Sequence, residues 1–151
     1  MDLSVETFNR AIKELGYEGF IPSIDTLEYL NDTVNGMNID IFNLYNLGRR
    51  SRGNTLTIYY PISRYDEFPP IGVSYDSSGP VSPKSLFENI QAFYRQPLSR
   101  DNILAYVQAE PEIYDFLQDE SRPALRDAMI ELVNIEGLTP YENGYLLNLG
   151  S

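Results

Sequence analysis

Thr55-Leu-Thr-Ile-Tyr-Tyr60 and Ile71-Gly-Val-Ser-Tyr75 are the two stretches of this sequence that decide the fold class. Both are short runs of β-branched and aromatic residues, and Pro or Gly bounds each of them, a pattern that is typical of β-strands. Asp66-Glu-Phe-Pro-Pro70, which lies between them, predicts an irregular loop. The sequence therefore predicts at least two strands in its middle third.

Helical patterns lie on both sides of these strands. Ser4 is placed to cap a first helix that ends at Gly16, and Asp25 with Glu28 forms a capping-box pattern for a second one. Asn143-Gly144 is a strong signal for a tight hairpin turn. Helices are predicted over residues 4–16, 25–36, 38–48 and 82–97, from 99, from 111 and over 122–128, and further strands over 129–135 and 145–149.

This order of elements predicts an α+β fold, because the helices and strands do not alternate regularly. We expect a mainly antiparallel sheet of about four strands packed with helices. Residues 1–151 are expected to form a single domain, with a helical N-terminal region, 1–52, packed on it. Strands Thr55–Tyr60 and Tyr145–Leu149 are expected at sheet edges, where either one could pair with a second copy across a two-fold axis.

The composition is that of an ordinary globular protein. Of 151 residues, 42% are hydrophobic and 22% are charged, and the chain contains no cysteine, so we expect stability without disulfides. No apolar run is long enough to cross a bilayer, and the first residues lack the pattern of a secretion signal. We therefore expect an intracellular protein that is not secreted and has no membrane partner.

Acidic residues outnumber basic ones by 22 to 11, which gives a formal net charge of −11 and argues against a chain that mainly wraps nucleic acid. The charges are unevenly distributed. Residues 101–151 contain ten acidic and two basic residues, whereas residues 49–100 contain seven basic and four acidic ones. Complementary regions of this kind favour self-association, and we expect a homodimer.

Several short motifs after residue 55 lie in a familiar order: Pro70-Ile-Gly-Val-Ser-Tyr75, Gly79-Pro-Val-Ser-Pro-Lys-Ser-Leu-Phe-Glu-Asn-Ile90, Phe93-Tyr94, Pro97-Leu-Ser99, Glu136-Gly-Leu138 and Gly144-Tyr-Leu146. This region, about residues 55–151, resembles a protein family without an established activity in large DNA viruses that infect amoebae, and is similar to a fungal domain of unknown function. The resemblance implies a compact sheet with packed helices, and a location in the virion, the virus factory or the host cytoplasm. It implies no cofactor and no catalytic residue.

The sequence contains neither His nor Cys, which excludes a Ser-His-Asp triad, a thiolate nucleophile and a zinc site built on these residues. Gly48–Thr55 has the glycine spacing of a phosphate-binding loop, but Asn54 replaces its lysine and a strand follows. The acidic residues between Glu110 and Glu120 are interpreted as a solvated helix, not as a metal site. We therefore predict no enzymatic activity, no catalytic residue, no metal and no cofactor.

Two groups of side chains are candidates for binding. Arginines on a Gly-bounded loop could grip phosphate or carboxylate groups, and tyrosines on or near the two strands could form a contact surface. These residues are Arg49, Arg50, Arg52, Tyr59, Tyr60, Tyr65 and Tyr75. The favoured hypothesis is a non-enzymatic structural or protein-interaction protein acting as a homodimer. The alternatives are a nucleic acid or nucleoprotein-associated factor using the arginine loop and, less favoured, a carboxylate and metal-dependent hydrolase.

Overall fold

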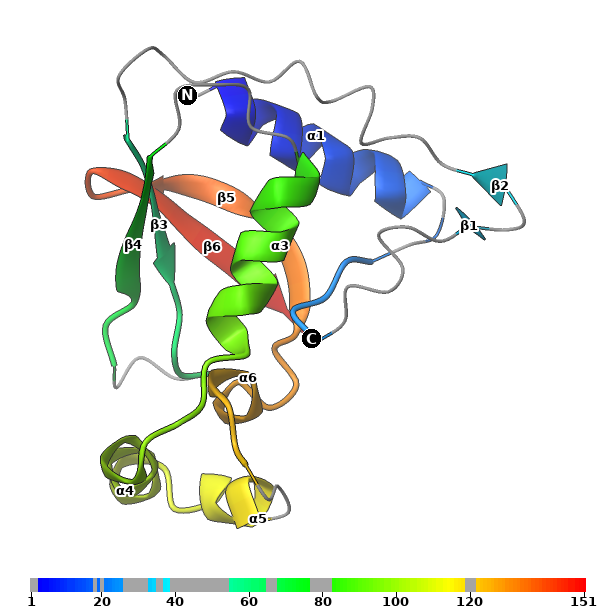
Figure 1. The fold of residues 1–151 in the computed structure, drawn as a ribbon. Helices are drawn as coiled ribbons and strands as arrows, with labels where there is room; N and C mark the ends of the chain where they lie inside the picture. Colours follow the sequence, from blue (N-terminus) through cyan, green and yellow to red (C-terminus); the bar gives the residue numbers. More distant parts are fainter. Residues whose placement is uncertain are drawn as a thin grey trace.

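A four-stranded sheet, with strands in the order β4-β3-β6-β5, forms the centre of the fold (Figure 1). The computed structural model describes residues 3–17, 19, 21–25, 33–34, 37–38, 55–64, 68–76, 83–118 and 122–151. The strands are β3 (Thr55–Tyr60), β4 (Ile71–Asp76), β5 (Asn134–Tyr141) and β6 (Gly144–Gly150). Antiparallel pairing joins β3 to β4 and β5 to β6, whereas β3 and β6 run parallel. The predicted α+β class with a mainly antiparallel sheet is confirmed.

The helices have the bounds that their caps and apolar spacing favour. Ser99 caps the helix Arg100–Ala109, because its hydroxyl accepts a hydrogen bond from the backbone N–H of Asn102 at 3.1 Å. The helices are α1 (Leu3–Tyr17), α3 (Pro83–Tyr94), α4 (Arg100–Ala109), α5 (Ile113–Gln118) and α6 (Leu125–Ala128). Two short strands, β1 (Thr33–Val34) and β2 (Met37–Asn38), pair with each other.

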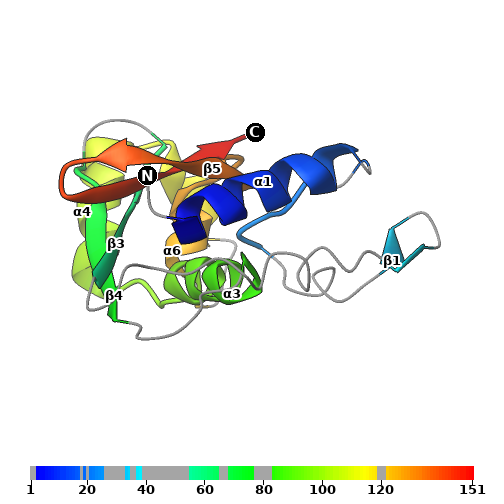
Figure 2. The same cartoon turned by 90° about the horizontal axis from the view of Figure 1, so that it is seen from above.

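Helices α1 and α3 cover one face of the sheet (Figure 2). Their apolar side chains meet the inward residues of the strands, and the ring of Phe8 on α1 lies 4.7 Å from that of Phe87 on α3. Tyr60 on β3 stacks on Phe93 with ring centroids 4.1 Å apart. Strand β3 alternates between buried and less buried residues, so its other side chains point to the opposite face.

A second apolar cluster lies beyond one end of the sheet, where α4, α5 and α6 pack together (Figure 1). Its buried members are Leu98, Tyr106, Ile113, Leu117 and Ala128. The hydroxyl of Tyr106 donates a hydrogen bond to the carbonyl of Ile62, which follows β3. The small helical layer is thereby joined to the sheet at the exit of β3.

Several predicted elements need correction. Thr33–Val34 and Met37–Asn38 are strands where helices were predicted over 25–36 and 38–48, and most of those two segments lies outside the described residues. The strand predicted over 129–135 begins only at Asn134, because the backbone turns at Ile130, which has a φ of 58°.

The predicted edge strands are the interior strands of the sheet, since β3 and β6 pair with each other and each has a further neighbour. The prediction that either strand pairs with a second copy is therefore wrong. The hairpin signal at Asn143-Gly144 is confirmed, although the turn residues are Glu142 and Asn143 and Gly144 is the first residue of β6. Among the described helices, none is long and apolar enough to span a membrane.

Candidate functional site

The predicted binding residues do not form one site. Arg49, Arg50, Arg52 and Tyr65 lie outside the described residues. Tyr60 has no exposed surface and belongs to the core, because β3 turns every second side chain toward α1 and α3. Of the predicted tyrosines, Tyr60 is therefore a packing residue and not a contact residue.

Tyr75 is tied to that core. Its hydroxyl and the hydroxyl of Tyr60 are 2.6 Å apart, across the β3–β4 pair. Burial raises the pKa of Tyr60 well above its ordinary value, and the hydrogen bond with Tyr75 raises it further. Burial also raises the pKa of Tyr75, while the same hydrogen bond lowers it. Both phenols therefore stay neutral at physiological pH, and Tyr75 is bonded to a core residue.

The face of the sheet opposite α1 and α3 is the candidate site, and we call it the open face. In Figure 2, no labelled helix lies on the far side of β5 and β6 from α1. Among the described side chains, those on this face are partly or fully exposed, and its middle is neutral. The members are Thr55, Thr57 and Tyr59 on β3, Ser74 on β4, Thr139 and Tyr141 on β5, and Leu146 and Asn148 on β6, and the exposed Glu136 lies at the Gly150 end of the face.

Tyr59 lies at the centre of the open face and is held from three directions. Its hydroxyl donates a hydrogen bond to the side-chain oxygen of Asn143 in the β5–β6 turn. Its ring meets that of Tyr141 edge-on, with centroids 5.0 Å apart. On its other side the ring covers Gly72, where an added Cβ would lie 2.8 Å from Cε1 of Tyr59. The ring is thus held by contacts within the fold.

Polar side chains surround this tyrosine pair. The hydroxyls of Thr57 and Ser74 are 2.9 Å apart, and the side-chain amide of Asn148 donates to the hydroxyl of Thr139 at 3.1 Å. The arrangement offers aromatic surface, hydroxyl groups and amides without a charge in its middle. Interfaces between proteins favour this composition, since their centres are rich in Tyr and depleted of Asp, Glu and Lys.

A second polar cluster is buried near the end of β3. Ser63 donates a hydrogen bond of 2.6 Å to Glu110, and both residues are at least nine-tenths buried. Burial, and then the charge of Glu110, raise the pKa of nearby Tyr106 to about 12. A serine beside a carboxylate is a pair found in some active sites, but here it lies where the helical layer meets the chain after β3. We interpret it as a structural clamp.

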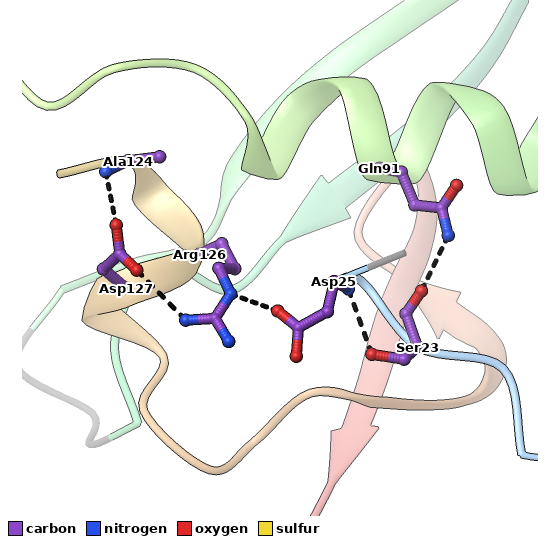
Figure 3. A network of polar contacts seen from close by, with 6 residues as sticks. All are labelled: Ser23, Asp25, Gln91, Ala124, Arg126 and Asp127. Carbon is purple, nitrogen blue, oxygen red and sulfur yellow. Dashed lines mark hydrogen bonds and ion pairs between the residues drawn. The ribbon is translucent and has the colours of Figure 1, made fainter. Parts of the chain in front are cut away.

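A third cluster connects three elements of the fold (Figure 3). Arg126 on α6 donates from Nε to Asp25 and from Nη1 to Asp127, the latter at 3.0 Å. The other oxygen of Asp127 accepts the backbone N–H of Ala124 at 2.7 Å and so caps α6. Burial lowers the pKa of Arg126, but its bonds to Asp25 and Asp127 outweigh this and raise the value.

The same network continues to α3. Ser23 accepts a hydrogen bond from the backbone N–H of Asp25 at 3.0 Å, and its carbonyl accepts one from the side-chain amide of Gln91 at 2.8 Å. The network therefore fixes the segment after α1 against α3 and α6 (Figure 3). Its bonds join three segments of the chain, and we interpret the network as structural.

Within the described ranges, no group of three or more acidic side chains is placed to hold a metal ion. Of the acidic residues between Glu110 and Glu120, Glu110 is buried against Ser63, whereas Glu112 and Asp115 are exposed. In comparisons with known proteins, no family model, no curated protein and no solved structure matches this chain. The resemblance to viral and fungal proteins stays a prediction.

Sequence reasoning identified Tyr59 but missed the residues that hold it. Tyr141 and Asn143 come from the β5–β6 hairpin, more than 80 residues away along the chain. The one available signal was Asn143-Gly144, because a tight turn brings the ends of two strands together and places Tyr141 beside the next strand. No pattern in the sequence indicated that this turn would reach over β6 to β3.

Proposed function

We propose that this chain is a non-enzymatic protein-interaction or structural protein that works as a homodimer and binds other proteins through the open face of its sheet. The observation that carries the proposal is a tyrosine-centred face with an uncharged middle on a protein with a net charge of −11. Because acidic side chains cover much of such a surface, a neutral area is where another protein can approach with least electrostatic cost.

The preset position of Tyr59 supports the same function. Binding normally costs the entropy of fixing side chains, and a tyrosine already held by Asn143 and Tyr141 has little left to lose. The proposal assigns a structural role to the clusters around Glu110 and Arg126, whose hydrogen bonds and ion pairs join separate elements of the fold. A virion or virus-factory location belongs to the proposal only through the sequence resemblance.

The test is capture of partners from the native source by the tagged chain, with a charge placed on the open face. Thr139→Arg puts a cation on this face at an exposed residue of β5, in the same row as Leu146 and Tyr59, and Gln108→Arg puts the same charge at an exposed residue of α4. We expect the Thr139→Arg variant to capture at least tenfold less partner than the parent chain, and the Gln108→Arg variant to capture the same amount. Equal capture by both variants would contradict the role of the open face.

A further inference from the structure

The two edge strands of the sheet, β5 and β4, differ in how far other residues bond to their backbones. On β5 the backbone of Leu138 is bonded in both directions by the side-chain amide of Asn9, with two hydrogen bonds of 2.9 Å. The backbone N–H of Ile135 donates to the carbonyl of Pro22 at 2.8 Å. Pro140 has no N–H to offer, and Gly137 lies at an irregularity of the strand.

An edge that is occupied in this way cannot add a further strand. Covering an edge with other residues, placing proline in it and interrupting it with a bulge are the devices by which proteins prevent unwanted pairing. All three occur on β5. The β5 edge is therefore closed to a second chain.

The β4 edge carries none of these devices over Ile71–Ser74. In the part of the chain that the structure describes, no residue outside β3 bonds to the backbone of these four. Its side chains there are uncharged, and Ile71 is 43% exposed, the only exposed large apolar side chain on a described strand. In Figure 1, β4 forms one margin of the sheet.

We propose that β4 is the surface on which two copies of this chain meet, antiparallel and across a two-fold axis that passes beside Val73. This inference rests on the proposed function in taking the chain to work as a homodimer, and it does not involve partners of the open face. The product is one continuous sheet of eight strands, four from each copy.

The second copy is the occupant that the sequence of the edge fits. When two β4 strands pair across a two-fold axis, the two sheets form one continuous sheet only if the side chains that lie opposite each other point to the same face. Pro70 and Asp76 bound a five-residue stretch centred on Val73. If the two-fold axis passes beside Val73, all five residues pair with the second copy.

In this register the side chains complement one another. Ile71 lies opposite Tyr75 of the second copy, a β-branched and aromatic pair of the kind that stabilises neighbouring strands. Gly72 lies opposite Ser74, and Val73 opposite its own equivalent. No two like charges face each other along the stretch, which matters for a chain with a net charge of −11. Because the contact is short, we expect micromolar or weaker association.

The experiment uses the absence of cysteine from the chain. Opposed residues of antiparallel strands have Cα atoms about 4.5–5.5 Å apart, which a disulfide can bridge. We therefore expect Val73→Cys to cross-link two copies under mild oxidation. Cys at position 74 is offset from its equivalent in the second copy by two positions, about 7 Å along the strand. The yield of cross-linked dimer from Ser74→Cys should therefore not exceed that from Gln108→Cys on α4. Cross-linking at Ser74 but not at Val73 would overturn this register.

A second measurement does not depend on oxidation. Sedimentation equilibrium from about 1 µM to about 1 mM should show a reversible dimer, and Ile71→Lys should weaken it at least tenfold, since an edge lysine blocks strand pairing. The exposure of Ile71 lets the variant fold, which circular dichroism checks. A dimer unaffected by Ile71→Lys overturns the β4 contact but leaves the homodimer. A monomer at every concentration overturns both, while partner capture through the open face is still decided by Thr139→Arg.

Discussion

Substitution of Gly144 by Ala is expected to be among the most damaging single-methyl additions in the sheet. Gly144 begins β6, and its backbone lies beside Thr57 of β3. A Cβ at this position would lie 2.3 Å from the backbone oxygen of Thr57 and 2.9 Å from its Cβ. Ordinary contact starts at about 3.4 Å, so the two strands must separate by about 1 Å. The obstacle is backbone, which cannot rotate away.

The size of the effect follows from what that shift disturbs. Overpacking costs about 1–3 kcal/mol, and weakening a backbone hydrogen bond of the short parallel ladder, Ile58–Tyr145 and Tyr59–Leu146, adds about 1 kcal/mol. The lower entropy of the unfolded Ala variant returns about 0.4–1 kcal/mol. We expect a net loss of about 1–3.5 kcal/mol, which at about 2–4 °C per kcal/mol lowers Tm by roughly 2–14 °C.

The matched control is Gly16→Ala in the last turn of α1. A Cβ there meets no atom within 4 Å, and alanine favours a helix over glycine by about 0.5–1 kcal/mol, so this variant should be as stable as the parent or more so. Urea denaturation followed by circular dichroism measures both. A Gly144→Ala variant that unfolds within about 0.5 kcal/mol of the parent would refute the close contact between β6 and β3.

Two further predictions concern the clamp at the end of β3. Because burial and the charge of Glu110 raise the pKa of Tyr106 to about 12, the unfolded state loses its phenolic proton first, and stability should fall between about pH 10 and pH 12. In the Tyr106→Phe variant, the urea midpoint should fall less steeply over that pH range. At neutral pH the free energy of unfolding should decrease by about 1 kcal/mol, because the hydrogen bond to Ile62 is lost. Ser63→Ala should cost about 1–3 kcal/mol in the same assay, against less than about 0.5 kcal/mol for the exposed control Gln108→Ala, and equal costs would contradict a buried clamp.

Local signals in the sequence were sufficient for most of the regular elements. Strands β3 and β4 were predicted from β-branched and aromatic runs, and α3 and α4 from Pro83 and Ser99 at their starts. These signals are local because a cap or a proline acts within one turn of the helix. Where the signal was weak, as over 25–48, the short strands at Thr33–Val34 and Met37–Asn38 replaced predicted helices.

The order of strands could not be predicted, because it depends on pairing between distant segments. Strand β6 lies between β3 and β5, and this makes β3 an interior strand and β4 an edge. Tyr60 is buried and Tyr59 is not, because α1 and α3 cover the face to which Tyr60 points. The alternation of side chains along a strand does not show which of its two faces will be covered. The tyrosines were therefore recognisable as a group, but their roles were not.

The bond between Asn9 and Leu138 joins positions 129 residues apart, and the parallel pairing of β3 with β6 joins Ile58 to Tyr145. Neither contact can form on a ribosome until nearly all of this sequence has left the exit tunnel. Helix α1 can meet α3 earlier, through Phe8 and Phe87, but its place on β5 does not exist until that strand has emerged. Closing such long loops is slow, so we expect the sheet to be completed only after β6 has emerged, on a millisecond to second scale, and we expect a need for protection from aggregation until then.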